Sequence, residues 1–167
     1  MARANETDIA QILTTGVLMK KWISYYFCIQ FLMLTTAFAE PAMQTKPVTI
    51  NIINIKQERG GQLVVFVFLE SGFPKVHEQS IMRFKRMVDN NKMQMMIQVP
   101  SQEMFAIKVL HDENMDEKVT KNWTGIIPRD GIGFSNGARI GFGPPKFSAA
   151  KIRYAENVTL TIDLQYF

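Results

Sequence analysis

From residue 45 onward, apolar and polar side chains alternate along most of the chain, which is the pattern of β-strands with one buried face. The clearest example is residues 158–166, where five apolar side chains alternate with four polar ones. Four further alternations predict strands, at residues 48–52, 93–99, 105–109 and 152–154. Short polar or glycine-containing segments separate most of these strands, as expected for hairpin turns.

Three segments depart from this alternation. Residues 62–69 (QLVVFVFL) are apolar on both faces, which predicts a central strand covered on both sides. The alternation changes parity at Ile53 and Ile55, which predicts a β-bulge. Between Pro74 and Asp89 apolar residues recur at roughly helical spacing, which predicts a short amphipathic helix. Six or seven strands with hairpins and one short crossover helix predict an all-β fold, an antiparallel β-sandwich.

The N-terminal region has the features of a secretory signal peptide. Lys20 and Lys21 precede an apolar run over residues 22–34, and the segment Ala37-Phe38-Ala39 supplies small residues before a cleavage site. The apolar run is shorter than the roughly 20 residues that span a bilayer. Cleavage after Ala39 is therefore favoured over an uncleaved membrane anchor.

This interpretation divides the chain into three parts. The basic pair directly follows Met19, so we expect translation to start there and residues 1–18 to be a gene-start artefact. Residues 19–39 are then the signal peptide, and residues 40–167 form a single periplasmic or secreted domain with no membrane insertion after cleavage. The one cysteine, Cys28, lies within the signal peptide, so no disulfide is expected in the domain. The formal net charge of +4 is too small to favour nucleic acid as a partner.

The stretch from residue 111 to residue 147 interrupts the strands and contains six of the chain's ten glycines. Long ordered excursions are usually functional, so we expect the functional face here. Glycines allow close backbone approach, aromatic rings supply flat apolar surface, and an arginine binds a carboxylate or sugar acid through two N–H groups. The candidate ligand-binding residues are His111, Phe134, Ser135, Asn136, Arg139 and Phe142. The alternative is that the phenylalanines plug the open end of the sandwich.

Two motifs carry a family resemblance: MFAIKVLHDEN at residues 104–114 and GIGFSNGARIGFGPPKF at residues 131–147. Together with Gly72-Phe73-Pro74, they resemble a family of small secreted bacterial proteins, domain of unknown function 2141. The resemblance covers residues 48–167. It implies a secreted protein of a Gram-negative bacterium with an immunoglobulin-like or transthyretin-like sandwich, and it implies no particular activity.

Asp112, Asn114 and Asp116 stand at alternate positions, the spacing by which a tight turn directs oxygen ligands toward one hard cation such as calcium. An EF-hand is excluded, because Glu117 stands where that loop needs glycine and Trp123 where it needs a bidentate glutamate. The spacing of these three residues still makes calcium the one cofactor to consider. The alternative is a solvated acidic loop without a metal.

His111 shares the parity of residues 105, 107 and 109, so we expect its ring to point inward and to hold the loop through backbone hydrogen bonds. A hydrolase would join His111 with Asp112 and Ser135 as base, orienting residue and nucleophile. Adjacent strand residues face opposite ways, and the sequence around Ser135 is not a nucleophile elbow. These points disfavour an enzyme.

The sequence thus predicts a secreted or periplasmic binding or accessory module. Its expected partner is a small molecule, a glycan or an envelope protein. A calcium-stabilised structural domain is the first alternative, and a hydrolase follows well behind.

Overall fold

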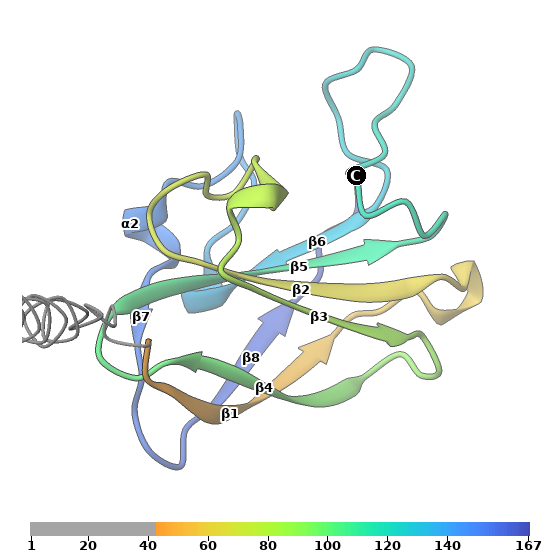
Figure 1. The fold of residues 1–167 in the computed structure, drawn as a ribbon. Helices are drawn as coiled ribbons and strands as arrows, with labels where there is room; N and C mark the ends of the chain where they lie inside the picture. The colour runs from red at the N-terminus through yellow and green to blue at the C-terminus, as the bar shows by residue number, and fades with distance from the viewer. Residues whose placement is uncertain (1–42) are drawn as a thin grey trace, which may run out of the picture. The chain divides into compact units, whose positions relative to one another are not determined.

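The computed structural model describes residues 43–167 as two β-sheets that lie face to face (Figure 1). The predicted gene-start artefact and signal peptide, residues 1–39, lie outside the described residues, and so do residues 40–42 of the predicted domain. Residues 43–167 cluster as one unit through their own contacts. No helix within them is long and apolar enough to cross a bilayer. The predicted all-β sandwich is confirmed.

The first sheet has three strands in the order β4-β1-β8. Strand β1 (Thr45–Ile53) pairs antiparallel with β4 (Met93–Pro100) and parallel with β8 (Thr159–Asp163). The parallel pair departs from the antiparallel arrangement that we predicted. It forms because β1 and β8 are at opposite ends of the domain sequence, so no hairpin fixes their relative direction.

The second sheet runs in the order β3-β2-β5-β6 and is antiparallel throughout. Strand β2 (Gln62–Phe68) lies between the edge strand β3 (Met82–Met87) and β5 (Met104–Asp112). Strand β6 (Gly131–Phe134) pairs with the second half of β5, and β7 (Ile152–Arg153) pairs with its first two residues.

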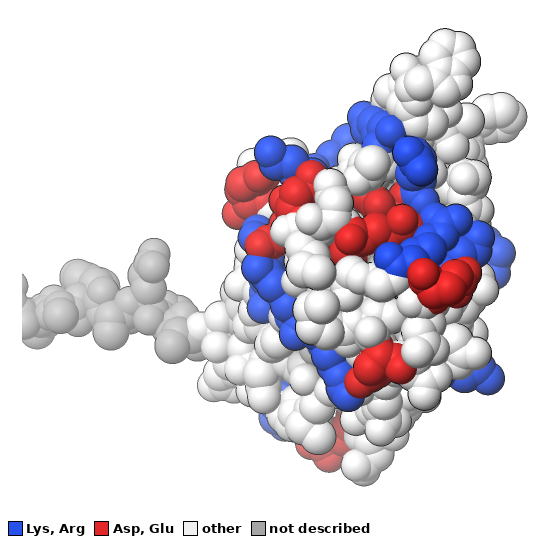
Figure 2. Space-filling model, turned by 90° about the vertical axis from the view of Figure 1, so that its right-hand side faces the viewer, with Lys and Arg blue, Asp and Glu red and all other residues white. Residues whose placement is uncertain are grey.

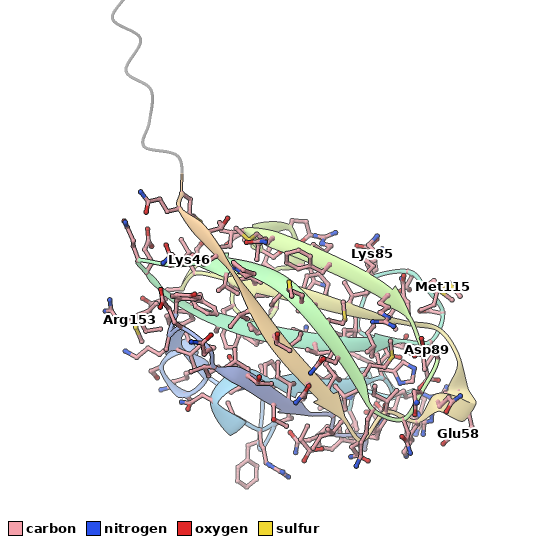
Figure 3. All side chains as sticks on the ribbon, turned by 90° about the horizontal axis from the view of Figure 1, so that it is seen from below. Lys46, Glu58, Lys85, Asp89, Met115 and Arg153 are labelled. Carbon is pink, nitrogen blue, oxygen red and sulfur yellow. The ribbon has the colours of Figure 1, made fainter. Side chains whose placement is uncertain are left out.

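The main apolar core lies between the two sheets. It consists of alternate side chains of β1, β4 and β8 on one side and the odd-numbered side chains of β2 and β5 on the other. Seen from below, β1 and β4 cross obliquely over the strands of the second sheet (Figure 3). Such a core is the main stabilising feature of a sandwich, since apolar burial contributes roughly 25 cal/mol per Å².

The outer face of the second sheet is covered as well. Its even-numbered side chains, with Phe66 and Leu110 among them, form a second apolar cluster. The cover comes from the connection between β2 and β3, from residues 113–147 and from the single helical turn α2 (Phe147–Ala150). All of β2 is therefore buried, which confirms the prediction for this strand.

The amphipathic helix predicted between Pro74 and Asp89 is wrong. The segment contains a 3-10 turn, η2 (His77–Gln79), and then strand β3. Pairing with β2 decides this outcome, because every residue of β3 has a partner in β2 and the backbone groups that face β2 are hydrogen-bonded. The spacing looked helical because Ile81 and Val88, on either side of the strand, also pack against the core.

At the change of parity, the Ile55 N–H donates to the Asn91 carbonyl at 3.0 Å, one residue out of register with the pairing of β1 and β4, which is the arrangement of the predicted β-bulge. Strand β1 ends at Ile53, and Asn54 takes a φ of 63° before Ile55 enters the core. The Asn54 side-chain amide donates to the Leu164 carbonyl at 2.6 Å, which stabilises this conformation. A second 3-10 turn, η1 (Gln57–Arg59), then leads into β2.

Candidate functional site

Lys108 of β5 is a charged side chain on the covered face of the second sheet. In the strand register it lies between Phe66 of β2 and Phe134 of β6, two members of the second apolar cluster. Only 3% of Lys108 is exposed. Lysines are almost never buried to this degree without dedicated partners, so its surroundings are the first place to look for a site.

The Lys108 ammonium has two hydrogen-bond partners from the connection between β2 and β3. Nζ donates to the Pro74 carbonyl at 3.0 Å and to Nε2 of His77 at 2.6 Å. Burial lowers the pKa of Lys108 to about 8, and the charge of Asp130 opposes this shift. The amine is therefore mainly protonated at neutral pH, and one of its three donors is left for a further partner.

His77 is held in a fixed orientation beside this amine. Its ring stacks on Phe66 with centroids 4.1 Å apart, and Nδ1 lies 2.8 Å from the carbonyl oxygen of Glu117. A neutral ring donates its Nδ1–H to this carbonyl and accepts the Lys108 hydrogen bond at Nε2. Burial, followed by the charge of Lys108, lowers the pKa of His77, which favours this neutral form.

The loop after β5 is tied to the edge strand on the same side. The Glu117 carboxylate binds Arg83 at 2.7 Å and also binds Lys85. The hydrogen bond from Lys85 is the main reason that the pKa of Glu117 is lowered, with a further contribution from Arg83. These ion pairs hold one wall of the site in place.

Lys108 and His77 line a cavity of about 770 Å³ between the loops that cover the second sheet. This volume lies within the range of sites that enclose a small molecule. The walls are mainly apolar, and their larger apolar side chains are Ile126, Ile127, Phe134, Ile140, Phe142 and Phe167. The more exposed charged residues Lys75, Glu78, Glu117, Lys118 and Lys121 also line the cavity. The cavity thus combines an apolar volume with one buried cation, an arrangement that fits a molecule with an apolar body and an anionic group.

Two of the six predicted ligand-binding residues, Phe134 and Phe142, line this cavity. Phe134 also packs edge to face against Phe73 at a centroid distance of 5.9 Å, and Phe73 packs in the same way against Phe147. These phenylalanines cover the outer face of the second sheet and do not plug an open end. Phe142, by contrast, is fully exposed.

Three other predicted residues make contacts that hold the loops. The Ser135 hydroxyl, in the 3-10 turn η3 (Ser135–Gly137), accepts a backbone N–H of β5 and donates to a carbonyl of α2. Asn136 has a φ of 56° and donates its side-chain amide to another carbonyl of α2 at 3.0 Å. Arg139 pairs with Asp163 at 2.9 Å on the surface. None of the three is among the residues that line the cavity.

His111 points into the interior, as predicted, and is completely buried. Its Nε2 lies 2.6 Å from the Gly60 carbonyl, and its Nδ1 lies 2.7 Å from the Tyr166 hydroxyl. Both ring nitrogens are therefore engaged by partners other than Asp112 and Ser135. The three residues of the hydrolase alternative do not form a hydrogen-bonded triad.

The three predicted metal ligands are neighbours in the loop after β5. The Asp112 carboxylate accepts the backbone N–H groups of Asp116 and Glu117, at 3.2 and 2.9 Å, and the side-chain amide of Gln62 at 2.8 Å. Asn114 donates to Asp116 at 3.0 Å. Within residues 43–167, no group of three His, Cys, Asp or Glu side chains is placed to hold a metal ion. Calcium binding stays a prediction.

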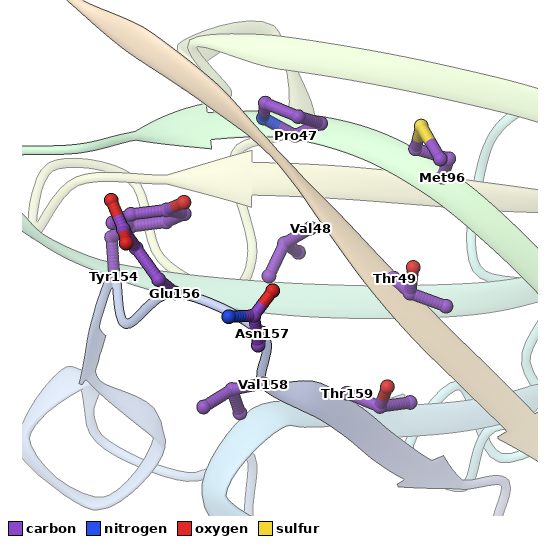
Figure 4. Close-up of a pocket in the computed structure, with 9 residues that line it drawn as sticks. All are labelled: Pro47, Val48, Thr49, Met96, Tyr154, Glu156, Asn157, Val158 and Thr159. Carbon is purple, nitrogen blue, oxygen red and sulfur yellow. The ribbon is translucent and has the colours of Figure 1, made fainter.

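A second hollow, of about 380 Å³, lies beside β1 and the segment that leads into β8 (Figure 4). Tyr154, Glu156 and Asn157 reach into it from that segment. Its charged member, Glu156, is largely exposed and pairs loosely with Lys46 at 3.4 Å. Because this hollow lacks a buried polar anchor, the larger cavity is the better candidate.

The sequence reasoning missed both Lys108 and His77. A signal for Lys108 was present, because a strand that is apolar on both faces, such as residues 62–69, needs neighbours that are covered on both faces. A lysine inside the run FAIKVL, residues 105–110, therefore had to be buried. His77 gave no such signal, since its position depends on how the whole connection between β2 and β3 folds.

Comparison with known proteins gives one match. A family described as "Uncharacterized protein conserved in bacteria (DUF2141)" matches residues 50–161, from β1 into β8. No curated protein and no solved structure matches the chain. The matched segment covers about two thirds of the chain and includes Lys108, His77 and the whole of residues 113–147. The chain therefore belongs to the DUF2141 family of proteins conserved in bacteria.

Proposed function

We propose that residues 43–167 are a binding module for a small molecule with an apolar body and one anionic group. The buried Lys108 ammonium at the apolar cavity is the observation that carries this proposal. Pro74 and His77 direct the ammonium and leave one donor for a ligand. The functional face is then the loop region 111–147, together with the connection between β2 and β3.

The energetics favour an anionic ligand over a neutral one. Burial lowers the pKa of Lys108, so the charged amine lies in an environment that solvates it poorly. A carboxylate, sulfonate or phosphate that enters the cavity compensates this charge, and a hydrogen bond to a charged group contributes about 1.5–3 kcal/mol. The apolar walls add roughly 25 cal/mol for each Å² of ligand surface that they remove from water.

We place this module in the periplasm or outside the cell. The support is the basic pair, the apolar run and the small-residue cleavage segment at residues 20–39.

The test is a pair of fluorescent probes that differ in charge. Anilinonaphthalene sulfonate carries an anionic group, and N-phenyl-1-naphthylamine has a similar apolar body without one. We expect the sulfonate to bind, and Lys108→Met to weaken it about 10-fold to 100-fold while it leaves the neutral probe within about twofold. Lys151→Met, which removes an exposed lysine, is the matched control.

Sulfonate binding should also weaken as the pH rises above about 8, because the Lys108 ammonium loses its proton there. Lys108→Met should abolish this pH dependence. Equal loss of both probes in Lys108→Met would contradict a charge-specific site. Unchanged sulfonate binding in that variant would contradict the site altogether.

A further inference from the structure

Two loops at the cavity expose large apolar side chains at their tips. The hairpin over residues 121–128 presents Trp123, which is 97% exposed, and Ile126, which is 78% exposed. The second loop, residues 139–146, presents the fully exposed Phe142. Side chains of this size rarely protrude together into water unless they meet a partner. We call Trp123, Ile126 and Phe142 the loop-tip residues.

The hairpin that carries Trp123 is internally bonded. The Asn122 backbone N–H donates to the Ile127 carbonyl at 2.8 Å. The Gly125 N–H donates to the Asn122 carbonyl at 2.9 Å, and Gly125 has a φ of 71° that suits glycine. The Asn122 side-chain oxygen accepts the Thr124 hydroxyl at 2.6 Å. These hydrogen bonds fix the turn conformation in which the Trp123 side chain is exposed.

Positive charge surrounds these tips. Residues 118–129 contain Lys118, Lys121 and Arg129 and no acidic residue. Residues 136–147 also contain no acidic residue and two basic ones, Lys146 and Arg139, of which Arg139 pairs with Asp163. The nearest exposed carboxylate along the chain, that of Glu117, is already paired with two basic residues of β3. Figure 2 shows an uncharged projection at the top of the molecule, with Lys and Arg gathered at its base.

We propose that the loop-tip residues dock on the surface of a bilayer that contains anionic lipids. Trp123 lies in the turn at the tip of the hairpin, two residues beyond the bridge between Lys121 and Pro128. In peripheral proteins, exposed apolar groups of this kind enter the boundary between headgroups and acyl chains to a depth of roughly 5–10 Å. The lysines behind the tips then lie at the level of the anionic headgroups.

A bilayer fits this surface better than a protein partner does. The tips are separate convex projections, and lipids rearrange around such projections, whereas a protein would need a preformed pocket for each. Tryptophan favours the membrane interface because its ring is apolar and its N–H group stays hydrated. Docking would also place the mouth of the cavity, which both loops line, at the bilayer surface.

The test uses residues 43–167, which contain both apolar clusters and every strand of the part of the chain that the structure describes, and so are expected to fold alone. Trp123 is the only tryptophan in this fragment, so its fluorescence reports on the tip directly. Vesicles of phosphatidylcholine are compared with vesicles that also contain 30 mol% phosphatidylglycerol. We expect binding to the anionic vesicles, a blue shift of the Trp123 emission, and quenching by lipids brominated in the acyl chain near the headgroup.

The variants separate the apolar and the charged contributions. Trp123→Ser should weaken binding to anionic vesicles more than tenfold. Because this variant lacks the fluorescent residue, its binding is measured by sedimentation with the vesicles. Replacing Lys118 and Lys121 by glutamine should also weaken it about tenfold or more, because each lysine near an anionic surface contributes about fivefold. Met96→Ser removes an exposed apolar side chain from the other sheet and should change nothing. Circular dichroism confirms that each variant is folded.

Absence of binding to anionic vesicles, or unchanged binding by folded Trp123→Ser, would overturn the proposal. The proposal does not rest on the ligand in the cavity, and its failure can be told apart from a failure of that function. Lys108→Met should bind vesicles as the unmodified fragment does, since Lys108 is buried. Trp123→Ser should bind the sulfonate probe normally, since Trp123 is not among the residues that line the cavity.

Discussion

The buried Lys108 should make the stability of the domain depend on pH in an unusual direction. Its pKa falls from the ordinary value of 10.5 to about 8 on folding, chiefly through burial. Between these two values the unfolded chain binds more protons at this position than the folded chain does. The free energy of unfolding therefore rises with pH across this window. From pH 7 to pH 9.5 the gain from Lys108 alone is about 2 kcal/mol.

The measurement is urea unfolding of residues 43–167 at half-unit steps from pH 7 to pH 9.5, for the unmodified fragment and for Lys108→Met. The variant lacks the titrating amine, so the difference between the two curves isolates its contribution. Two other shifted groups stay out of this window: the pKa of His77 is lowered from 6.5, and the pKa of Tyr166 is raised from 10.0, in both cases chiefly by burial. Lys151→Met, in which an exposed lysine is replaced, should follow the unmodified curve.

Parallel curves for the unmodified fragment and Lys108→Met would refute this reasoning. They would mean that the Lys108 amine is solvated as in the unfolded chain and that the cavity has no buried cation. A difference with the opposite slope would mean that a neighbouring carboxylate, with Asp130 the nearest candidate, stabilises the charge more than burial disfavours it.

Three further predictions concern the loops around the site. If the loop after β5 binds calcium, calcium should raise the melting temperature of the domain. This rise should be lost in both Asp112→Ala and Asp116→Ala. An unchanged melting temperature with calcium and with chelator would contradict calcium binding. Gly131→Ala should destabilise the fold by about 1–3 kcal/mol, because a methyl group there would overlap the ring of Tyr166; an unchanged urea midpoint would mean that the ring moves freely. Ser135→Ala should cost about 1–3 kcal/mol, because it leaves two buried backbone groups without their partner, and a loss below about 0.5 kcal/mol in the same assay would show that water replaces the hydroxyl.

Prediction from the sequence succeeded for features that depend only on the periodicity of one strand. The alternation at residues 93–99, the two apolar faces of residues 62–69 and the inward ring of His111 all follow from the fixed period of a strand. The helix predicted between Pro74 and Asp89 failed because helical and strand spacing are both compatible with a few apolar residues. Pairing between β2 and β3 selects the strand there, and local sequence does not contain that pairing.

The candidate site was less predictable from the sequence than the strands were. Phe134 and Phe142 were predicted to bind a ligand and do line the cavity, but Lys108 and His77 are 31 positions apart and meet only because β2 and β5 are neighbours. The sequence by itself determined the strand periods, the two-sheet class and the stretch of chain that carries the loops. The tertiary structure alone decided which face of the second sheet the loops cover and which polar groups are buried beneath them. The physical reason is that strand periodicity is a local property of the backbone, whereas the burial of a charge depends on which distant segments pack over it.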